Sequence, residues 1–360
     1  MREFIIQQWF LSTLAILIVS GVSLGFAGFG PQVQPIVSHI NPRWTTAGVL
    51  FLMAFSLDSD HLWAAFRSPR PVILGCLINY GLIPALAWLI SPLQHPTDFR
   101  LGLVIAATVP CTTAAASVMT RKARGNDAIS LLTTVATNLS CFVMTPLWLK
   151  WATGTQVDLD TKRLMVELLE AVLVPTILGQ ILRQPARLHT FAVKHKAAIS
   201  IIAQILIELL VLTAALRAGT ELHKLRSGSA DSTVLDEADS TPEVHPRGVP
   251  EHGLSLTRTV IVWGSCFGLH GVGLIAGWWL ARATGSSRRD AAAVAFAGSQ
   301  KTLPIGIYVS GLFGAAFPFA LFPMLLYHTT QLFYVLFHDA QLLAQRFELL
   351  AQCRIGQQQR

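Results

Sequence analysis

Residues 290–314 read DAAAVAFAGSQKTLPIGIYVSGLFG and place Lys301 at the centre of an otherwise apolar segment. Glycines and a proline surround this lysine, and both residue types weaken a helix. A charged side chain at mid-membrane depth costs about 2.5 kcal/mol or more, so an ionisable residue there is a functional candidate. Two interpretations stay open: Lys301 belongs to a binding site, or it only caps helix carbonyls where the helix breaks.

The composition around this segment is that of an integral membrane protein. Of 360 residues, 52% are hydrophobic and 13% are charged, whereas soluble domains carry about 25% charged residues. Because a spanning helix needs roughly 20 mainly apolar residues, we predict an all-α membrane protein with about ten transmembrane helices. The predicted spans are 4–26, 44–66, 71–91, 99–120, 127–149, 163–184, 197–217, 259–281, 290–313 and 316–341.

The basic residues of the loops predict how the helices are oriented in the membrane. Most Lys and Arg residues of the short loops fall on the side that holds both termini, and basic loops face the cytoplasm. We therefore expect a multi-pass protein of the plasma membrane with both termini in the cytoplasm. The long polar segment at about 218–257 is rich in Ser, Pro and acidic residues, which predicts a disordered tether on the outer face.

The same counts argue against other protein classes. The net charge of +7 comes from basic residues between the spans rather than from one basic face, so no nucleic-acid partner is expected. The five cysteines show no CxxC spacing, which indicates neither a metal site nor a disulfide framework. No small-residue cleavage site follows the first apolar segment, so we interpret it as a retained helix rather than a signal peptide.

The number of spans predicts an internal symmetry. Five spans fall in residues 1–151 and five in residues 162–345, followed by a cytoplasmic tail at 346–360. An odd number of helices per half places the halves in opposite orientations. Such inverted repeats are frequent in secondary transporters, where binding sites lie at broken helices.

The fourth and fifth spans carry further polar groups. In the fourth, Pro110 interrupts the helical pattern before Thr112, Thr113 and Ser117, which favours either unwound backbone along a cavity or an ordinary proline-kinked helix. In the fifth, one face carries the polar stripe Ser130, Thr134, Thr137, Asn138, Cys141 and Thr145. Oxygen atoms of this kind suit Na⁺ or a polar solute, and they equally suit hydrogen bonding between packed helices.

The remaining ionisable residues of the spans are secondary candidates. Glu167 lies near the end of its span and is expected to be solvated. Glu170 and Glu208 lie deeper, where each could pair with Lys301 or titrate. His270 and His328 are expected to be hydrogen-bonded core residues.

Four segments together resemble one transporter family. The run GSQKTLPIGI at 298–307 is similar to the Gly-Ser-x-Lys-Ser/Thr-Leu-x-x-Gly segment of the SBF-like branch of the bile acid:sodium symporter family. The segments ARGN at 123–126, PTILGQILR at 175–183 and LLYHTTQL at 325–332 agree in order and spacing. The resemblance covers nearly all of residues 1–345 except the 218–257 segment.

This resemblance implies two inverted five-helix repeats. Helices three to five and eight to ten would form a core domain, helices one, two, six and seven a panel, and helices four and nine would be broken and cross. In the family, Na⁺ is held by side chains of helices four, five and nine, which here implies a site at Ser130, Thr134 and Gln300, with Ser117 close to the helix-four position. The candidate substrate- and ion-binding residues are Thr112, Thr113, Ser117, Ser130, Thr134, Asn138, Ser299, Gln300, Lys301 and Thr302.

Two positions depart from the family pattern. Phe296 stands where the bile acid symporters have an acidic Na⁺ ligand, and Lys301 stands where they have an asparagine beside the glutamine. An ammonium repels Na⁺ by about 4 kcal/mol at 4 Å and an effective dielectric of 20. We therefore expect Lys301 to replace a sodium ion and hold the crossing together, or to titrate, or to meet an anionic substrate. Apart from Na⁺, no cofactor or metal is expected.

The sequence thus predicts a non-enzyme that carries a small organic anion across a lipid bilayer by alternating access. The resemblance implies coupling to Na⁺, whereas Lys301 leaves Na⁺, H⁺ or no coupling ion open. A membrane regulator or receptor that keeps the fold without transporting is the alternative. An intramembrane enzyme is disfavoured, because no paired carboxylates, metal-ligand cluster or Ser–His pair lies at a common depth.

Overall fold

The computed structural model describes residues 9–37, 39–57, 69–154, 159–227, 256–314, 316–331 and 334. Within these ranges every regular element is helical, as expected for an all-α membrane protein. The predicted tail at 346–360 lies outside them, as do most of the predicted tether and the end of the second predicted span.

Short connections join most of the helices. In chain order they are α2 (Trp9–Leu24), η1 (Gly25–Phe29), α3 (Gly30–Val37), α4 (Pro42–Ser56), α6 (Pro69–Leu77), η2 (Ile78–Leu82), α7 (Ile83–Ile90), η3 (Ser91–Leu93), α8 (Thr97–Thr108), α9 (Thr113–Lys122), α10 (Asp127–Thr153), α11 (Thr161–Leu168), η4 (Leu169–Leu173), α12 (Val174–Arg183), α13 (Ala186–Lys194), α14 (Lys196–Ser227), α15 (Leu256–Ala283), α16 (Arg288–Ser299) and α17 (Leu303–Leu312). Residues 322–331 are also helical.

Six helical stretches of the described part are long and apolar enough to cross a membrane. They are Ser12–Val33, Pro69–Leu93, Asp127–Thr153, Thr161–Arg183, Lys196–Lys224 and Leu256–Ala283. The fourth and ninth predicted spans are each divided between a helix of 12 residues and one of 10. The second and tenth are only partly described.

Three boundaries differ from the prediction. α14 continues to Ser227, so the polar residues 218–227 are helical rather than part of a tether. Helix-forming residues and an ion pair between Lys224 and Glu221, one turn apart, support this extension. α4 ends at Ser56, because Leu57 has extended backbone. The short helix α13 occupies the connection predicted as a loop.

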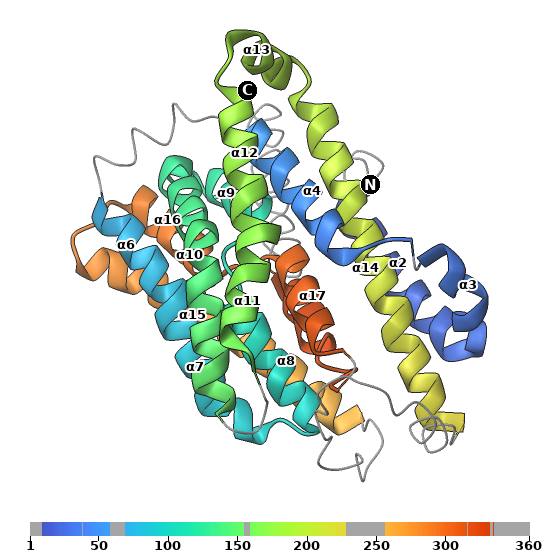
Figure 1. The fold of residues 1–360 in the computed structure, drawn as a ribbon. Helices are drawn as coiled ribbons and strands as arrows, with labels where there is room; N and C mark the ends of the chain where they lie inside the picture. The colour runs from blue at the N-terminus through green and yellow to red at the C-terminus, as the bar shows by residue number, and fades with distance from the viewer. Residues whose placement is uncertain are drawn as a thin grey trace, which may run out of the picture.

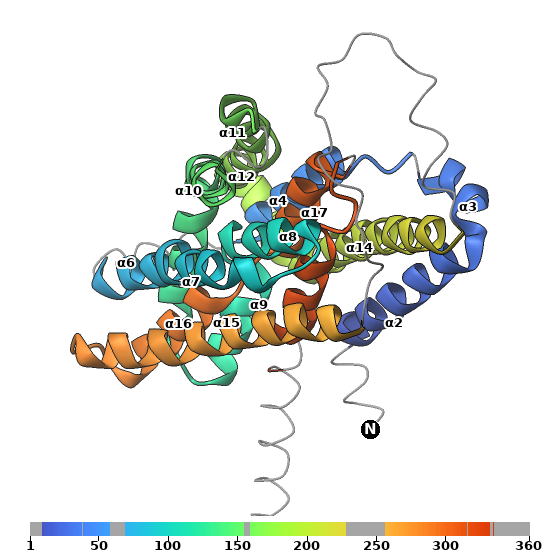
Figure 2. The same cartoon turned by 90° about the horizontal axis from the view of Figure 1, so that it is seen from below.

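The helices pack in two groups, which Figures 1 and 2 show from two directions. α14 packs against α2 and α4, and α12 packs against α4; we call α2, α4, α11, α12 and α14 the panel helices. α16 packs against α6, α10 and α15, and α7 packs against α8; we call α6 to α10 and α15 to α17 the core helices. α17 contacts both α4 and α14, so it lies at the boundary of the two groups.

Glycines bring α2 and α14 into backbone contact. A Cβ atom at Gly219 would clash with the carbonyl oxygen of Val22, and one at Gly25 would clash with that of Leu216. Small residues of this kind permit close packing in membranes, where lipid removes the hydrophobic drive for helix association.

We expect Gly219→Ala to destabilise the protein by roughly 1–3 kcal/mol, because overpacking forces the two helices apart. The measurement is thermal unfolding of the purified protein in detergent, followed by tryptophan fluorescence. Gly264→Ala on α15 is the matched control, since no heavy atom from another part of the described chain lies within 4 Å of the Cβ position there. Equal melting temperatures for the two variants would contradict the close packing of α2 and α14.

Candidate functional site

Two non-helical segments meet inside the core helices. Residues 109–112 separate α8 from α9, and residues 300–302 separate α16 from α17. The first and last residues of both segments have extended backbone. The amide of Thr302 donates a hydrogen bond to the carbonyl of Pro110 over 2.8 Å. We call this meeting point the junction.

Prolines explain both interruptions. Pro110 has no amide hydrogen to donate and disfavours the helical conformation in Val109, whose ψ is 155°. Pro304 lies in the first turn of α17, where a missing donor costs little. The interrupted helices leave carbonyl and amide groups unpaired. Because the residues of the junction are buried in the protein, side chains around it must satisfy those groups.

Lys301 is fully buried at the junction and donates to three oxygen atoms. Its ammonium lies 2.7 Å from the carbonyl of Asn79, 3.2 Å from Oδ1 of the same residue, and 3.1 Å from the carbonyl of Val109. The ring centre of Tyr80 lies 5.7 Å from Nζ, which adds a cation–π contact. The positive charge therefore faces the end of α8, where the helix dipole is negative.

Asn79, on the π-helical turn η2, ties the junction to the third predicted span. Its Nδ2 donates to the carbonyls of Ala297, Gly298 and Gln300 over 3.0–3.3 Å. These carbonyls belong to the end of α16, where no further helical turn follows. Asn79 is fully buried, so its side chain provides the donor that solvent would otherwise supply.

Side chains of α15 and of the helix at 322–331 bond the backbone at the interruption between α16 and α17. Oε1 of Gln331 accepts from the amide of Lys301 over 3.0 Å, and Nε2 of Gln331 donates to the carbonyl of Lys301 over 3.2 Å. The hydroxyl of Tyr327 donates to the carbonyl of Ser299 over 3.0 Å, and Nδ1 of His270 lies 3.2 Å from the same oxygen. The backbone around Lys301 is therefore held from several directions.

Polar side chains of the α10 stripe hydrogen-bond to backbone groups at the interruption between α8 and α9. Nδ2 of Asn138 donates to the carbonyl of Cys111 over 3.0 Å, and Oγ1 of Thr137 accepts from the amide of Cys111 over 3.3 Å. Oγ1 of Thr145 donates to the carbonyl of Thr108 over 2.7 Å. For these three side chains the contacts match the helix-packing interpretation of the stripe.

Three buried oxygen atoms on α10 and at the junction have no hydrogen-bond partner among the described residues. They are Oγ of Ser130, Oδ1 of Asn138 and Oε1 of Gln300. A buried polar atom without a partner costs about 1–3 kcal/mol. Oγ1 of Thr134, one turn after Ser130, donates to the carbonyl of Ser130 over 2.9 Å and keeps its lone pairs. Hydroxyl and amide oxygens are hard ligands, so atoms of this type suit a small hard cation.

Comparison with known protein families shows to which family the chain belongs. A model of the SBF-like CPA transporter family matches residues 8–225 and 249–348, which is most of the chain. The chain belongs to this family. The SBF-like assignment confirms the resemblance drawn from the four motifs, and it makes the protein a member of a membrane transporter family.

Two relatives of this SBF-like chain come from a plant and a bacterium. It is 31% identical over 167 residues to a protein of Arabidopsis thaliana named probable sodium/metabolite cotransporter BASS1, chloroplastic, covering 45% of this chain and 41% of the relative. It is 28% identical over 181 residues to the uncharacterized sodium-dependent transporter YocS of Bacillus subtilis (strain 168), covering 50% and 55%. The matched part thus spans about half the length of these relatives.

Most of the predicted binding residues of this SBF-like protein are buried in the core helices. The buried set is Thr112, Ser117, Ser130, Thr134, Asn138, Ser299, Gln300, Lys301 and Thr302. The side chain of Thr113 lies outside the described part of the chain. Ser117 accepts a long hydrogen bond of 3.5 Å from Arg121, and Ser299 donates to the carbonyl of Phe296 over 3.4 Å.

Neither Glu170 nor Glu208 pairs with Lys301, which removes one of the two alternatives given for these glutamates. Glu170 forms an ion pair with Arg43, and Glu208 accepts a hydrogen bond from Thr13. Both carboxylates are therefore satisfied by neighbouring panel helices. The ammonium of Lys301 takes carbonyl and amide oxygens of the core instead, which spares the burial of a second charge.

Two further expectations need correction. Glu167 is mostly buried rather than solvated, because it pairs with Arg163 at 3.1 Å and accepts from the hydroxyl of Tyr308 at 3.2 Å. His270 is hydrogen-bonded as expected. His328 is not: both of its ring nitrogens lack a partner within the described part.

The sequence also contains a junction residue that we overlooked. Asn79 is the lone amide in the run ILGCLINYGLIPALAWLI at 73–90. A polar side chain inside an apolar span usually meets a polar partner on another helix, so this signal was available. Gln331 belonged to a recognised motif, but nothing in the sequence pointed to its contact with Lys301.

Proposed function

We propose that this protein is a secondary transporter that carries a small organic anion across a lipid bilayer by alternating access, with Na⁺ as the coupling ion. The junction carries the proposal, because two interrupted helices meet where buried oxygens are left without a partner. In secondary transporters, substrates and coupling ions bind at interrupted helices near the bilayer midplane.

The position of the interruptions supports the proposed architecture of ten spans in two inverted repeats. One lies in the fourth predicted span and the other in the ninth, which are corresponding positions of the two halves. The division into core and panel helices supports a motion of one group against the other. α17 would then form a moving boundary, since it joins the junction to both α4 and α14.

In this proposal Lys301 is a fixed cation and Na⁺ is a mobile one. The ammonium is engaged by Asn79 and Val109, so it stabilises the end of α8 permanently. Na⁺ would be held by the unpartnered oxygens of Ser130 and Gln300 and by Oγ1 of Thr134, which lies one turn from Ser130. The names of the plant and bacterial relatives, which mention sodium, support this assignment.

The test is uptake of labelled organic anions by purified protein in liposomes, with an inward gradient of either Na⁺ or K⁺. We expect uptake that requires Na⁺ and that depolarisation alone does not produce. Equal uptake in both salts would refute sodium coupling but would still support the carrier function. Absence of flux under every gradient would instead favour a membrane regulator that keeps the fold.

Ser130→Ala is expected to raise the Na⁺ concentration for half-maximal uptake about tenfold, in line with the loss of one charge-assisted contact. The melting temperature should not fall, because Oγ of Ser130 has no protein partner to lose among the described residues. Ser140→Ala on the same helix is the control, since among the described residues Oγ of Ser140 bonds only carbonyls of its own helix. An unchanged Na⁺ response in Ser130→Ala would count against this ion site.

The proposed location is the plasma membrane, with both termini in the cytoplasm. The distribution of basic residues supports this orientation. The plant relative is named as chloroplastic, so location needs its own experiment. A C-terminal epitope tag on the protein in cells should bind antibody only after permeabilisation. Labelling of intact cells would show that the C-terminus lies outside the cell and would contradict the proposed orientation.

A further inference from the structure

The short helix α13 connects two long stretches of the panel. Thr161–Arg183 and Lys196–Lys224 are each long and apolar enough to cross a membrane, and α13 lies in the short connection between them. It contacts α4, α12 and α14, and Figure 1 shows it beyond the ends of α4 and α12. Because the stretches on both sides of it cross the bilayer, α13 lies at the membrane surface.

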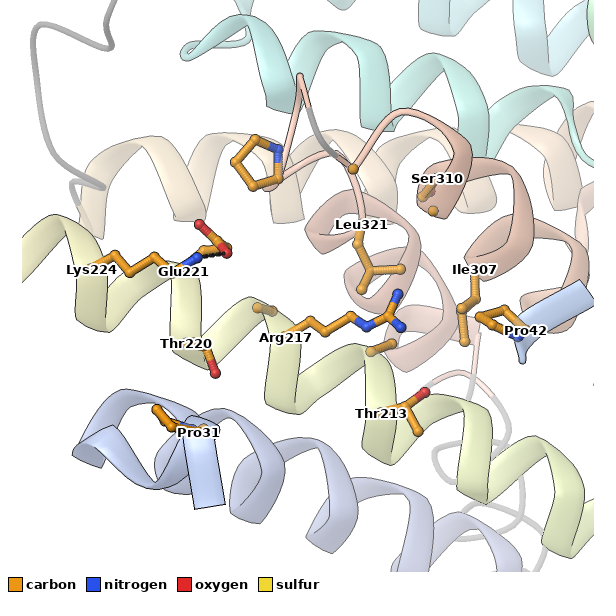
Figure 3. A pocket seen from close by; sticks show the side chains of 16 residues that line it. Pro31, Pro42, Thr213, Arg217, Thr220, Glu221, Lys224, Ile307, Ser310 and Leu321 are labelled. Carbon is orange, nitrogen blue, oxygen red and sulfur yellow. Dashed lines mark hydrogen bonds and ion pairs between the residues drawn. The ribbon is translucent and has the colours of Figure 1, made fainter. Parts of the chain in front are cut away.

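The cavity between panel and core lies toward the other end of α14. Its volume is about 460 Å³, and Thr213, Arg217 and Thr220 line it from α14 (Figure 3). α13 adjoins the first residue of α14, Lys196, so Thr213 lies roughly 25 Å further along the helix at 1.5 Å per residue. No residue of α13 lines this cavity. The surface of α13 is therefore separate from any site between the two groups of helices.

One face of α13 is apolar. Leu188, Phe191 and Ala192 lie three and four positions apart, so they share this face. Ala192 is fully buried and packs with Phe55 of α4 and Ile199 of α14, which fixes how α13 sits on the panel. Leu188 is 38% exposed and Phe191 is 51% exposed, so these two side chains extend from the apolar face past the panel helices.

The neighbouring ends of α12 and α14 are apolar and exposed as well. Ile181 and Leu182 on α12, and Ile201 and Ile202 on α14, are large exposed hydrophobic residues. An exposed apolar surface of this kind on a membrane-crossing helix faces lipid chains. Lipid therefore reaches the two ends that α13 connects, and the apolar side chains of α13 continue the same surface.

Basic residues flank the apolar face of α13. Arg187 and Lys194 are seven positions apart and form a row beside Phe191. Both are exposed, and neither side chain has a hydrogen bond or an ion pair among the described residues. Residues 171–207 contain no Asp or Glu, so no acidic residue nearby in the sequence compensates these charges. The row therefore offers two cations at the level where lipid headgroups lie.

We propose that α13 is an interfacial helix that binds anionic phospholipids, with Leu188 and Phe191 against the acyl chains and Arg187 and Lys194 on the headgroup phosphates. Amphipathic helices with basic residues beside an apolar face bind anionic membrane surfaces in this way. Each surface cation strengthens the attraction to anionic lipid about fivefold. Lipid bound here holds the end of the panel at one depth in the bilayer. The proposal requires only that the chain spans a membrane, so it is independent of transport.

The experiment is photo-crosslinking of the full chain in nanodiscs that contain equal amounts of phosphatidylglycerol and phosphatidylcholine. Phe191→benzoylphenylalanine places the reactive group on the apolar face of α13, and intact-protein mass spectrometry identifies the attached lipid. We expect lipid adducts in which phosphatidylglycerol exceeds phosphatidylcholine at least about fivefold, the effect of one surface cation. In the background Arg187→Gln/Lys194→Gln this ratio should fall to about one.

Val272→benzoylphenylalanine on α15 is the matched control position, because Val272 is 45% exposed in the middle of a membrane-crossing helix. It should give lipid adducts without a headgroup preference in every background, which also shows that each variant is inserted in the bilayer. Arg288→Gln/Arg289→Gln removes the same charge from the start of α16, where Ala291–Ala295 are buried and leave no apolar face. The ratio at position 191 should then stay high.

Two results would overturn the proposal. Absence of lipid adducts at position 191, while position 272 gives them, would mean that the apolar face of α13 does not meet the bilayer. Equal adducts of the two lipids at position 191 would mean that Arg187 and Lys194 do not select anionic headgroups. Neither result would bear on the proposed transport, and failure of transport would leave the lipid preference at α13 unchanged.

Discussion

Lys301→Met is expected to abolish uptake and to lower the free energy of unfolding by roughly 3–5 kcal/mol, the cost of breaking a buried charge interaction. The methionine keeps most of the volume of the lysine stem but has no donor. The carbonyls of Asn79 and Val109 and Oδ1 of Asn79 would then lose the ammonium that now faces them. Since α8 ends at this point, the loss falls on a helix terminus that water does not reach.

The two measurements are anion uptake in liposomes and unfolding in mixed detergent micelles. Lys150→Met on α10 is the matched control, because Lys150 is an exposed lysine near the end of its helix. Lost uptake with unchanged stability would mean that Lys301 contacts the solute rather than supports the backbone. Normal uptake together with normal stability would contradict both roles for this residue.

The sequence was informative where a single residue type has a fixed physical consequence. Pro110 and Pro304 lack an amide hydrogen; Pro110 lies within the first non-helical segment, and Pro304 lies just after the second. A lysine in an apolar run must find acceptors, and Lys301 has three. Of the ten spans predicted from apolar length, six coincide with helical stretches of the described part that are long and apolar enough to cross a membrane.

The sequence was uninformative where the partner lies far away along the chain. Asn79 and Lys301 are separated by 222 positions, and no local pattern indicates that they touch. Glu170 and Glu208 looked like partners for Lys301 because opposite charges attract. Arg43 and Thr13 satisfy them instead, since the packing of the panel helices brings these groups closer. The cavity at Arg217 has the same origin, because its walls come from α14 and α17.

Asn79→Ala is expected to cost about 2–4 kcal/mol of stability and to reduce uptake at least tenfold, because several buried groups lose a partner at once. Nδ2 of Asn79 donates to three carbonyls at the end of α16. Its Oδ1 also accepts from the ammonium of Lys301. One small side chain therefore fixes the second interruption and orients the charge beside it.

The double variant Asn79→Ala/Lys301→Met should be more stable than the sum of the two single effects predicts, by at least about 1 kcal/mol. Groups that share one hydrogen-bond network are not additive, whereas distant groups are. Asn126→Ala is the control, because Asn126 bonds Asp290 near the opposite end of α16. Its effect should add to that of Lys301→Met. Additive effects for Asn79 would mean that it supports α16 independently, and the junction would then be two adjacent contacts rather than one coupled unit.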